Sequence, residues 1–362
     1  MMEKLKSAAK RMNMPRLIII LFFVFIVLLA YFNDINVNSF IGSTLKYWGM
    51  WGVLVLAMVP SIKCGIGPNF GISLGIVCGL LGSLLSIEFG ITDMFNAILP
   101  GLGPWAAIAF AMISSAFFAW FVGVGYGKIL NCVKGSEMTV TTYIGYSFIY
   151  LMCIVWFRAP FTNSEIKWPI GASGVRNSLS MESSFGEVLN DFLGFEIAGV
   201  YVPTGLILFF LLCCLVVYLY FRSKSGMAMT AAGANPNFAR ANGIDVDKMR
   251  VKGIAISTVL GAIGIIVYTQ GFGILQAYTA PLTMGFQCVA AILIGGATTG
   301  KAKISHVIIG TFIFQGLLMF TPSVSNKLLA GTDISDTMRQ IIQNGVILYA
   351  LTKAKGGSSN EE

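Results

Sequence analysis

The side chains that most often carry catalysis are too few and too scattered in this sequence to form an active site. His306 is the only histidine, and it lies at the start of an apolar stretch with no nucleophile or base indicated beside it. No serine–histidine–aspartate set and no pair of carboxylates is recognisable. The sequence therefore predicts no catalytic residue in this chain.

One glycine-rich stretch invites comparison with a nucleotide-binding loop. Residues Gly295–Lys301 match the phosphate-binding pattern G-x-x-x-x-G-K, but Ala302 follows. That site needs Ser or Thr at this position to bind Mg²⁺, and a soluble strand before it. Here an apolar stretch of membrane length precedes it. We expect a turn between two membrane helices and no cofactor bound by this chain.

The cysteines are spread along the chain without a C-x-x-C pair. Metal sites and disulfide frameworks usually show close, regular cysteine spacings. We interpret these residues as small apolar packing groups and predict no metal site. They are Cys64, Cys78, Cys132, Cys153, Cys213, Cys214 and Cys288.

Polar side chains inside the long apolar stretches are neutral. No acidic residue lies near the middle of any such stretch. Carriers driven by ions or protons commonly keep carboxylates there, because these groups bind and release the driving ion. Neutral amides instead suit a hydroxyl-rich solute or hydrogen bonds between helices. They are Gln270, Gln287, Gln315 and Asn344.

Membrane helices must position these residues. The chain is 56% hydrophobic and only 11% charged, whereas soluble domains carry about 25% charged residues. One crossing takes about 20 apolar residues. The sequence therefore predicts an all-α polytopic membrane protein with about ten spans. The ten stretches are Pro15–Phe32, Leu45–Ile62, Ile66–Ile87, Trp105–Tyr126, Thr139–Phe157, Val202–Phe221, Gly253–Phe272, Pro281–Thr298, Ile304–Thr321 and Thr337–Thr352.

The distribution of basic residues predicts the orientation. With the N-terminus inside, the inner segments hold 18 of the 24 Lys and Arg residues, as the positive-inside rule requires. This explains the net charge of +8 without a nucleic-acid partner. We therefore expect cytoplasmic segments at 1–16 and 353–362 around a membrane domain at 17–352. The first stretch lacks a signal-peptide cleavage site, so it is expected to remain as a span.

Two longer segments interrupt the apolar stretches. Residues 158–201 form the expected external loop, which is polar around Trp168-Pro169 and Gly171 and amphipathic near Phe185–Phe195. This loop either meets an external partner or is a plain surface loop. Residues 222–252 form the expected basic cytoplasmic loop.

The third apolar stretch carries glycine every four residues, at Gly67, Gly71, Gly75 and Gly79. Such a face lets another helix backbone approach closely in lipid. The stretch begins Gly65-Ile66-Gly67-Pro68-Asn69-Phe70-Gly71, which is poor helix sequence. A broken helix at membrane depth is tolerated where it is buried in protein or lines a cavity. We therefore expect tight packing, a place on a solute pathway, or both.

The cytoplasmic loop contains signals for a short helix between two spans. Asn235 is a typical N-cap and Pro236 fits the first helical turn, while Gly243 suits the left-handed residue after a helix end. Asp245 can cap the helix that follows. A helix of about two turns does not persist alone in water, so it is expected to pack on a partner.

This loop resembles the coupling loop of ABC importer permeases, the group that serves ribose, other simple sugars, nucleosides and branched-chain amino acids. The resemblance covers most of the chain from Lys63 to Lys353. In that family the short helix docks in a groove of the ATP-hydrolysing subunit. The resemblance assigns coupling to Gly233, Asn235, Pro236, Ala239, Arg240, Ala241, Gly243 and Ile244, with Arg250 also matching. Alanines would enter the groove and Arg240 would meet acidic groups.

Two further stretches carry the resemblance. Many sugar permeases have an acidic residue in the glycine-rich motif of the third span, whereas Asn69-Phe70-Gly71-Ile72 stands here, and the nucleoside branch has a comparable Asn-x-Gly pattern. Glu137 after Lys134-Gly135-Ser136 is similar to a glycine-x-x-glutamate helix start, and suits a first helical turn. The pathway or its helix packing would involve Gly67, Asn69, Phe70, Gly71, Gly75, Gln270, Gln287 and Asn344.

The resemblance implies the non-catalytic permease subunit of an ATP-driven importer in the bacterial plasma membrane, carrying a simple sugar of the ribose or galactose type. The alternatives are the same machine carrying nucleosides, or an ion-coupled secondary transporter. The implied partners are an ATP-binding subunit that uses ATP and Mg²⁺, an extracytoplasmic solute-binding protein, and a second copy or sister permease.

Overall fold

The computed structural model is a bundle of helices, and 76% of the residues that it describes are helical. It describes residues 14–33, 35–168, 174–197, 199–328 and 335–356. The helices are α2 (Met14–Phe32), α3 (Val37–Leu56), α4 (Met58–Lys63), η1 (Phe70–Ile72), α5 (Ser73–Glu88), α6 (Ile91–Ile98), α7 (Gly103–Cys132), α8 (Glu137–Arg158), α9 (Val188–Asp191), α10 (Thr204–Arg222), α11 (Lys224–Ala234), α12 (Pro236–Ala241), α13 (Val246–Phe272), α14 (Ala280–Ile294), α15 (Ile304–Leu328) and α16 (Ser335–Gly356).

Within the described ranges, seven helical segments are long and apolar enough to cross a membrane, and two shorter apolar helices accompany them. Each of the ten predicted stretches contains a helix, so the polytopic helical prediction is confirmed. Several helices extend past the predicted bounds: α7 reaches Cys132 and α13 begins at Val246. These extensions are polar or amphipathic ends, which an apolar stretch does not reveal.

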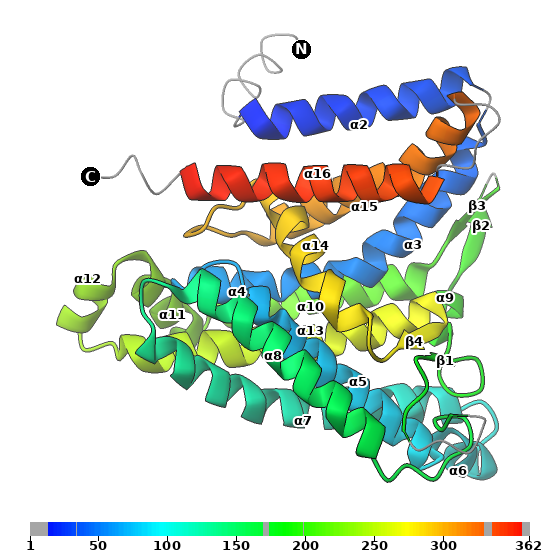
Figure 1. Ribbon diagram of the computed structural model, residues 1–362, viewed down its shortest axis with the longest axis horizontal. Helices are drawn as coiled ribbons and strands as arrows, with labels where there is room; N and C mark the ends of the chain where they lie inside the picture. The colour runs from blue at the N-terminus through cyan, green and yellow to red at the C-terminus, as the bar shows by residue number, and fades with distance from the viewer. Residues whose placement is uncertain (1–13, 34, 169–173, 198, 329–334, 357–362) are drawn as a thin grey trace.

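The structure is mostly helical, and in the part of the chain that it describes four three-residue strands also connect the helices. β1 (Ser178–Ser180) pairs with β4 (Ile274–Gln276), and β2 (Phe195–Ile197) pairs with β3 (Val200–Val202), both antiparallel. The first pair buries Leu179 and Leu275. Short extended connections side by side satisfy their backbone groups by pairing. Figure 1 shows both pairs at one end of the bundle, which we call the strand end, and α11 and α12 at the opposite end, the α12 end.

Helix α13 is the centre of the bundle. It packs against α7, α5, α3, α4 and α11. Within its most apolar stretch of 18 residues, 72% is buried. Glycines make this packing close. A Cβ atom added at Gly75 of α5 would clash with the carbonyl oxygen of Thr258, and one at Gly123 of α7 would lie 2.8 Å from the Cα atom of Ala255.

The glycine face of the third span is confirmed in part. Gly75 and Gly79 lie on α5 and meet α13, near Thr258 and Ala262 respectively. Gly67 lies before the helix, with a φ of +97°, and Gly71 lies in η1. The stripe therefore does not form one continuous helix face. The helix is broken at the start of this span, a point that the poor helix sequence there left open.

We expect Gly75→Leu to prevent close packing of α5 on α13. A large side chain there meets main-chain atoms of α13, and overpacking in a dense interior costs about 1–3 kcal/mol or more. The fraction of monodisperse protein after detergent extraction, and its thermal unfolding temperature, should both fall.

Gly125→Leu on α7 is the matched control, because an added Cβ atom there meets nothing within 4 Å. Equal behaviour of the two variants would contradict the packing described for Gly75.

Candidate functional site

The loop between α10 and α13 is held by three side-chain caps. The Ser223 hydroxyl accepts a hydrogen bond from the Gly226 N–H (3.3 Å) and starts α11. The Asn235 side chain accepts one from the Phe238 N–H (3.0 Å) and starts α12. The Asp245 carboxylate accepts one from the Lys248 N–H (3.0 Å) and starts α13. Gly243, with a φ of +76°, follows the end of α12. The predicted caps and stop are confirmed, while α11 is an additional helix.

Asp245 is charged at neutral pH. The Lys248 N–H and the Lys248 side chain, whose Nζ lies 3.1 Å from the carboxylate, hold the pKa of Asp245 below its usual value. Negative charge at the first turn also suits the positive end of the helix dipole. The start of α13 is therefore stabilised mainly by the Asp245 cap, since the exposed pair with Lys248 adds little.

The two sides of α12 have different roles. Ala239 is fully buried and packs with Ala232 and Val246, with Ile244 half-buried beside them. Ala239 thus belongs to the loop's own core. The outward side presents Phe238, which is 64% exposed, together with exposed Arg240 and Ala241. Sequence reasoning missed Phe238, although an aromatic residue beside a short capped helix was a usable signal.

Gly233 ties this loop to the broken third span. A Cβ atom added at Gly233 would clash with the carbonyl oxygen of Lys63, and one at Gly65 would lie 2.9 Å from the Cα atom of Gly233. The two glycines therefore let α11 touch the segment after α4. Gly233 positions the loop rather than facing outward.

The broken segment is fastened by Asn69. Its side-chain amide donates to the Ser257 hydroxyl of α13 (3.0 Å), and its oxygen accepts from the Tyr126 hydroxyl of α7 (3.0 Å). Asn69 is fully buried. Gly71 lies against Tyr126 in turn. Both residues hold the irregular backbone in place instead of facing a cavity.

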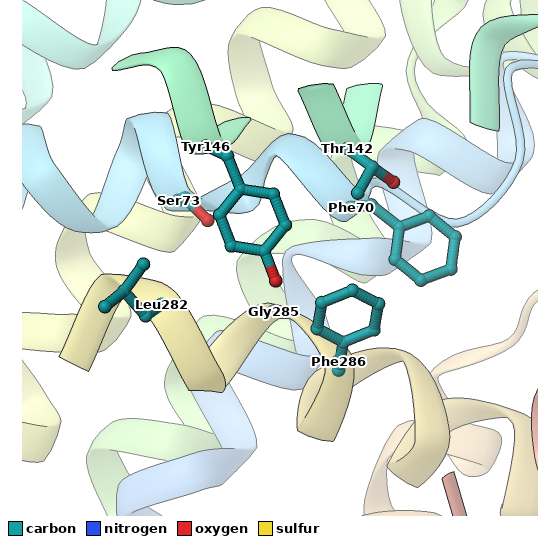
Figure 2. Close-up of a pocket in the computed structure, with 7 residues that line it drawn as sticks. All are labelled: Phe70, Ser73, Thr142, Tyr146, Leu282, Gly285 and Phe286. Carbon is teal, nitrogen blue, oxygen red and sulfur yellow. The ribbon is translucent and has the colours of Figure 1, made fainter. Parts of the chain in front are cut away.

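Phe70, the next residue, lines a recess between η1, α5, α8 and α14 (Figure 2). The Phe70 and Phe286 ring centres are 5.5 Å apart, and those of Tyr146 and Phe286 are 6.5 Å apart. Figure 2 shows the Tyr146 hydroxyl directed toward Gly285 and Phe286. The remaining lining residues are Ser73, Thr142, Leu282 and Gly285.

The recess is uncharged and small. Its cavity volume is about 10 Å³, room for about one water molecule, whereas small-molecule sites usually offer about 300–1,000 Å³. The hydroxyls of Ser73 and Thr142 donate to backbone carbonyls, which leaves their oxygen lone pairs for a ligand. Aromatic faces with hydroxyls between them suit a polar, uncharged molecule. Separate elements of the chain build the recess, so sequence reasoning found only Phe70.

The other predicted pathway residues lie elsewhere. The Gln270 side chain accepts from the Leu189 N–H (3.1 Å) and so holds α9 at the strand end. Gln287 is largely buried in α14, and Asn344 is exposed on α16. Gly67 lies in the turn before η1 near Thr299.

The predicted turn at Gly295–Lys301 joins α14 to α15, where Gly295 packs against His306.

These features define a class: a polytopic helical membrane protein with an uncharged internal recess and a short capped helix exposed at one end. The family described as "Branched-chain amino acid transport system / permease component" matches residues 40–351. The chain belongs to this family and is a multi-pass permease of the bacterial plasma membrane.

Curated relatives agree with this assignment at low identity. The nucleoside ABC transporter permease of Lactococcus lactis is 24% identical, over 72% of this chain and 79% of the relative. The xylose transport system permease of Escherichia coli is 22% identical, over 92% and 88% respectively. The D-allose transport system permease of Escherichia coli is 23% identical, over 91% and 89%. No solved structure matches the chain significantly.

We expect Asn69→Ala to destabilise the fold. It leaves the buried hydroxyls of Tyr126 and Ser257 without their partner, at a cost of about 1–3 kcal/mol. Thermal unfolding in detergent should occur at a lower temperature than for the wild type. Asn344→Ala, at an exposed position, should leave the unfolding temperature unchanged. A larger decrease for Asn344→Ala than for Asn69→Ala would contradict the fastening role of Asn69.

Proposed function

We propose that this chain is the translocating subunit of an ATP-driven importer for a simple sugar of the ribose or galactose type. The exposed side of α12 supports this proposal most strongly, since an aromatic and an arginine on a capped helix are typical of a docking surface. An ATP-binding subunit that uses ATP and Mg²⁺ docks there, and a solute-binding protein meets the strand end. The chain itself is non-catalytic.

We further propose ten spans with both termini in the cytoplasm. The ends of α2 at Met14 and of α16 at Gly356 lie on the same side of the bundle as α12 (Figure 1), in agreement with the basic segments. The exposed side of α12 is then cytoplasmic, and the loop from 158 to 201 is external. The predicted segments 1–16 and 353–362 fall largely outside the described residues.

The solute class rests on the recess and the relatives. An uncharged recess with hydroxyls and aromatic faces favours a neutral polyol, and two relatives are named for xylose and allose. The small volume of the recess fits a pathway completed by a second copy or sister permease. A nucleoside is the second candidate, because a nucleobase stacks on aromatic rings and one relative is named for nucleosides. Calorimetry of the solute-binding protein with xylose, allose and uridine distinguishes these solutes.

A membrane-impermeant maleimide tests the orientation. In intact cells it should label Ser183→Cys, an exposed residue near the strand end, and should label Asn237→Cys of α12 only after permeabilisation. Both variants are made with Cys132, the exposed native cysteine, replaced by Ser. Labelling of Asn237→Cys from outside would reverse the proposed topology.

Ala241→Glu tests the docking surface. Bulk and negative charge on the exposed side of α12 should weaken ATPase binding by about 2 kcal/mol, as for a charge left unpaired in an interface. Expression should be normal, while ATPase co-purification and solute uptake both decline.

The matched control is Ala97→Glu on α6, an exposed alanine at the strand end, which should keep the ATPase partner. If Ala241→Glu retains its ATPase and its uptake rate, α12 is not the coupling helix.

A further inference from the structure

An ion pair joins the second turn of α13 to the first residue of α8 at the α12 end. The Arg250 guanidinium Nη2 lies 2.5 Å from the Glu137 carboxylate, and the two side chains are only 9% and 14% exposed. Arg250 Nε also donates to the Asn131 side chain of α7 (3.0 Å). Glu137 accepts a further hydrogen bond from the Gly135 N–H (2.8 Å). Among the described residues, the other salt bridges are substantially exposed.

Besides this ion pair, α8 is attached at this end through Val140 and Ile144, which pack on the cluster that contains Tyr126 and Leu130 of α7. Only 22% of the most apolar 18-residue stretch of α8 is buried, and its packing partners are mainly η1 and α5. That contact is centred on Gly145, where an added Cβ atom would lie 3.4 Å from the Cα atom of Gly71. The helix is thus held at its middle by the broken span and at its first turn by Arg250.

The same helix forms one wall of the recess through Thr142 and Tyr146. These residues follow Glu137 by about one and a half and two and a half helical turns. On the other side of the ion pair, Arg250 lies on α13, the first helix after α12. A continuous chain of contacts therefore leads from α12 through Arg250 and Glu137 to the recess wall.

We propose that Arg250 and Glu137 are positioning residues that carry a displacement of α12 to α8 and so change the width of the recess. This inference rests on the proposed function, because the ATPase must supply the displacement. A buried, hydrogen-bonded pair suits this role because its two ends keep one geometry, whereas apolar contacts allow sliding. The neighbouring Lys134–Asp247 pair is 42% and 53% exposed, and exposed pairs contribute little.

Electron paramagnetic resonance distances between nitroxide labels test the link without knowledge of the solute. The labels are placed at Tyr143→Cys on α8 and Ile309→Cys on α15, both exposed, after the three native cysteines that are not buried, Cys132, Cys153 and Cys213, are replaced. The complex with its ATPase is measured without nucleotide and after trapping with ATP, Mg²⁺ and vanadate. The wild-type distance should shift by about 1–5 Å, the range of helix shifts in switching proteins.

In Arg250→Gln and Glu137→Gln the ATPase should remain bound and the shift should fall to less than half. Exchanging the charges, with Arg250→Glu and Glu137→Arg together, should restore most of it. Where a single variant does not fold, the double variant Arg250→Met with Glu137→Leu takes its place. This apolar pair leaves no unpaired buried charge, and we expect it to lose the shift as well. Lys134→Gln is the matched control and should shift as the wild type does.

The outcomes separate the two proposals. A wild-type complex that does not bind the ATPase contradicts the proposed function, whereas one that binds it but shows no shift on trapping overturns the link. A wild-type shift that persists in Arg250→Gln, Glu137→Gln or the apolar pair overturns the link alone. A lost shift that the charge exchange does not restore also overturns it, because the charge attraction would not then be what joins the helices.

Discussion

The close approach of helix backbones to α13 is the constraint on which the rest of this structure depends. In lipid the apolar side chains of two helices gain little from meeting each other, so association depends on dense packing and interhelical hydrogen bonds. Gly75 and Gly79 of α5 and Gly123 of α7 provide that packing. Because α13 runs from the loop after α12 to the strand end, every helix packed on it is placed relative to α12.

The broken third span shows how this packing supports an irregular segment. Its backbone cannot be exposed to lipid, since no water is present to satisfy its polar groups. Asn69 resolves this problem by joining α7 and α13 through Tyr126 and Ser257, and Gly233 brings α11 against the same segment. Phe70 can then face the recess from a rigid support. The recess and the loop between α10 and α13 consequently share one structural element.

Local signals were predictable from the sequence and distant contacts were not. The caps at Asn235 and Asp245 and the left-handed Gly243 depend on neighbours three residues away or fewer, so residue type alone indicates them. The partners of Asn69 lie 57 and 188 positions away, and the recess combines elements that are far apart in the chain. Gln270 illustrates this limit: a neutral amide in a span indicates either a solute contact or a hydrogen bond between elements, and only the fold shows that it accepts a hydrogen bond from Leu189 of α9.

The central claim is that ATP, and no ion gradient, drives transport through this chain. Uptake of radiolabelled xylose, allose and uridine by proteoliposomes containing the permease, its ATPase and its solute-binding protein tests it most directly, with ionophores collapsing all ion gradients. We expect at least one solute to accumulate when the ATPase is supplied with ATP and Mg²⁺, and accumulation to stop without ATP. Uptake that follows an imposed ion gradient and is indifferent to ATP would contradict the claim.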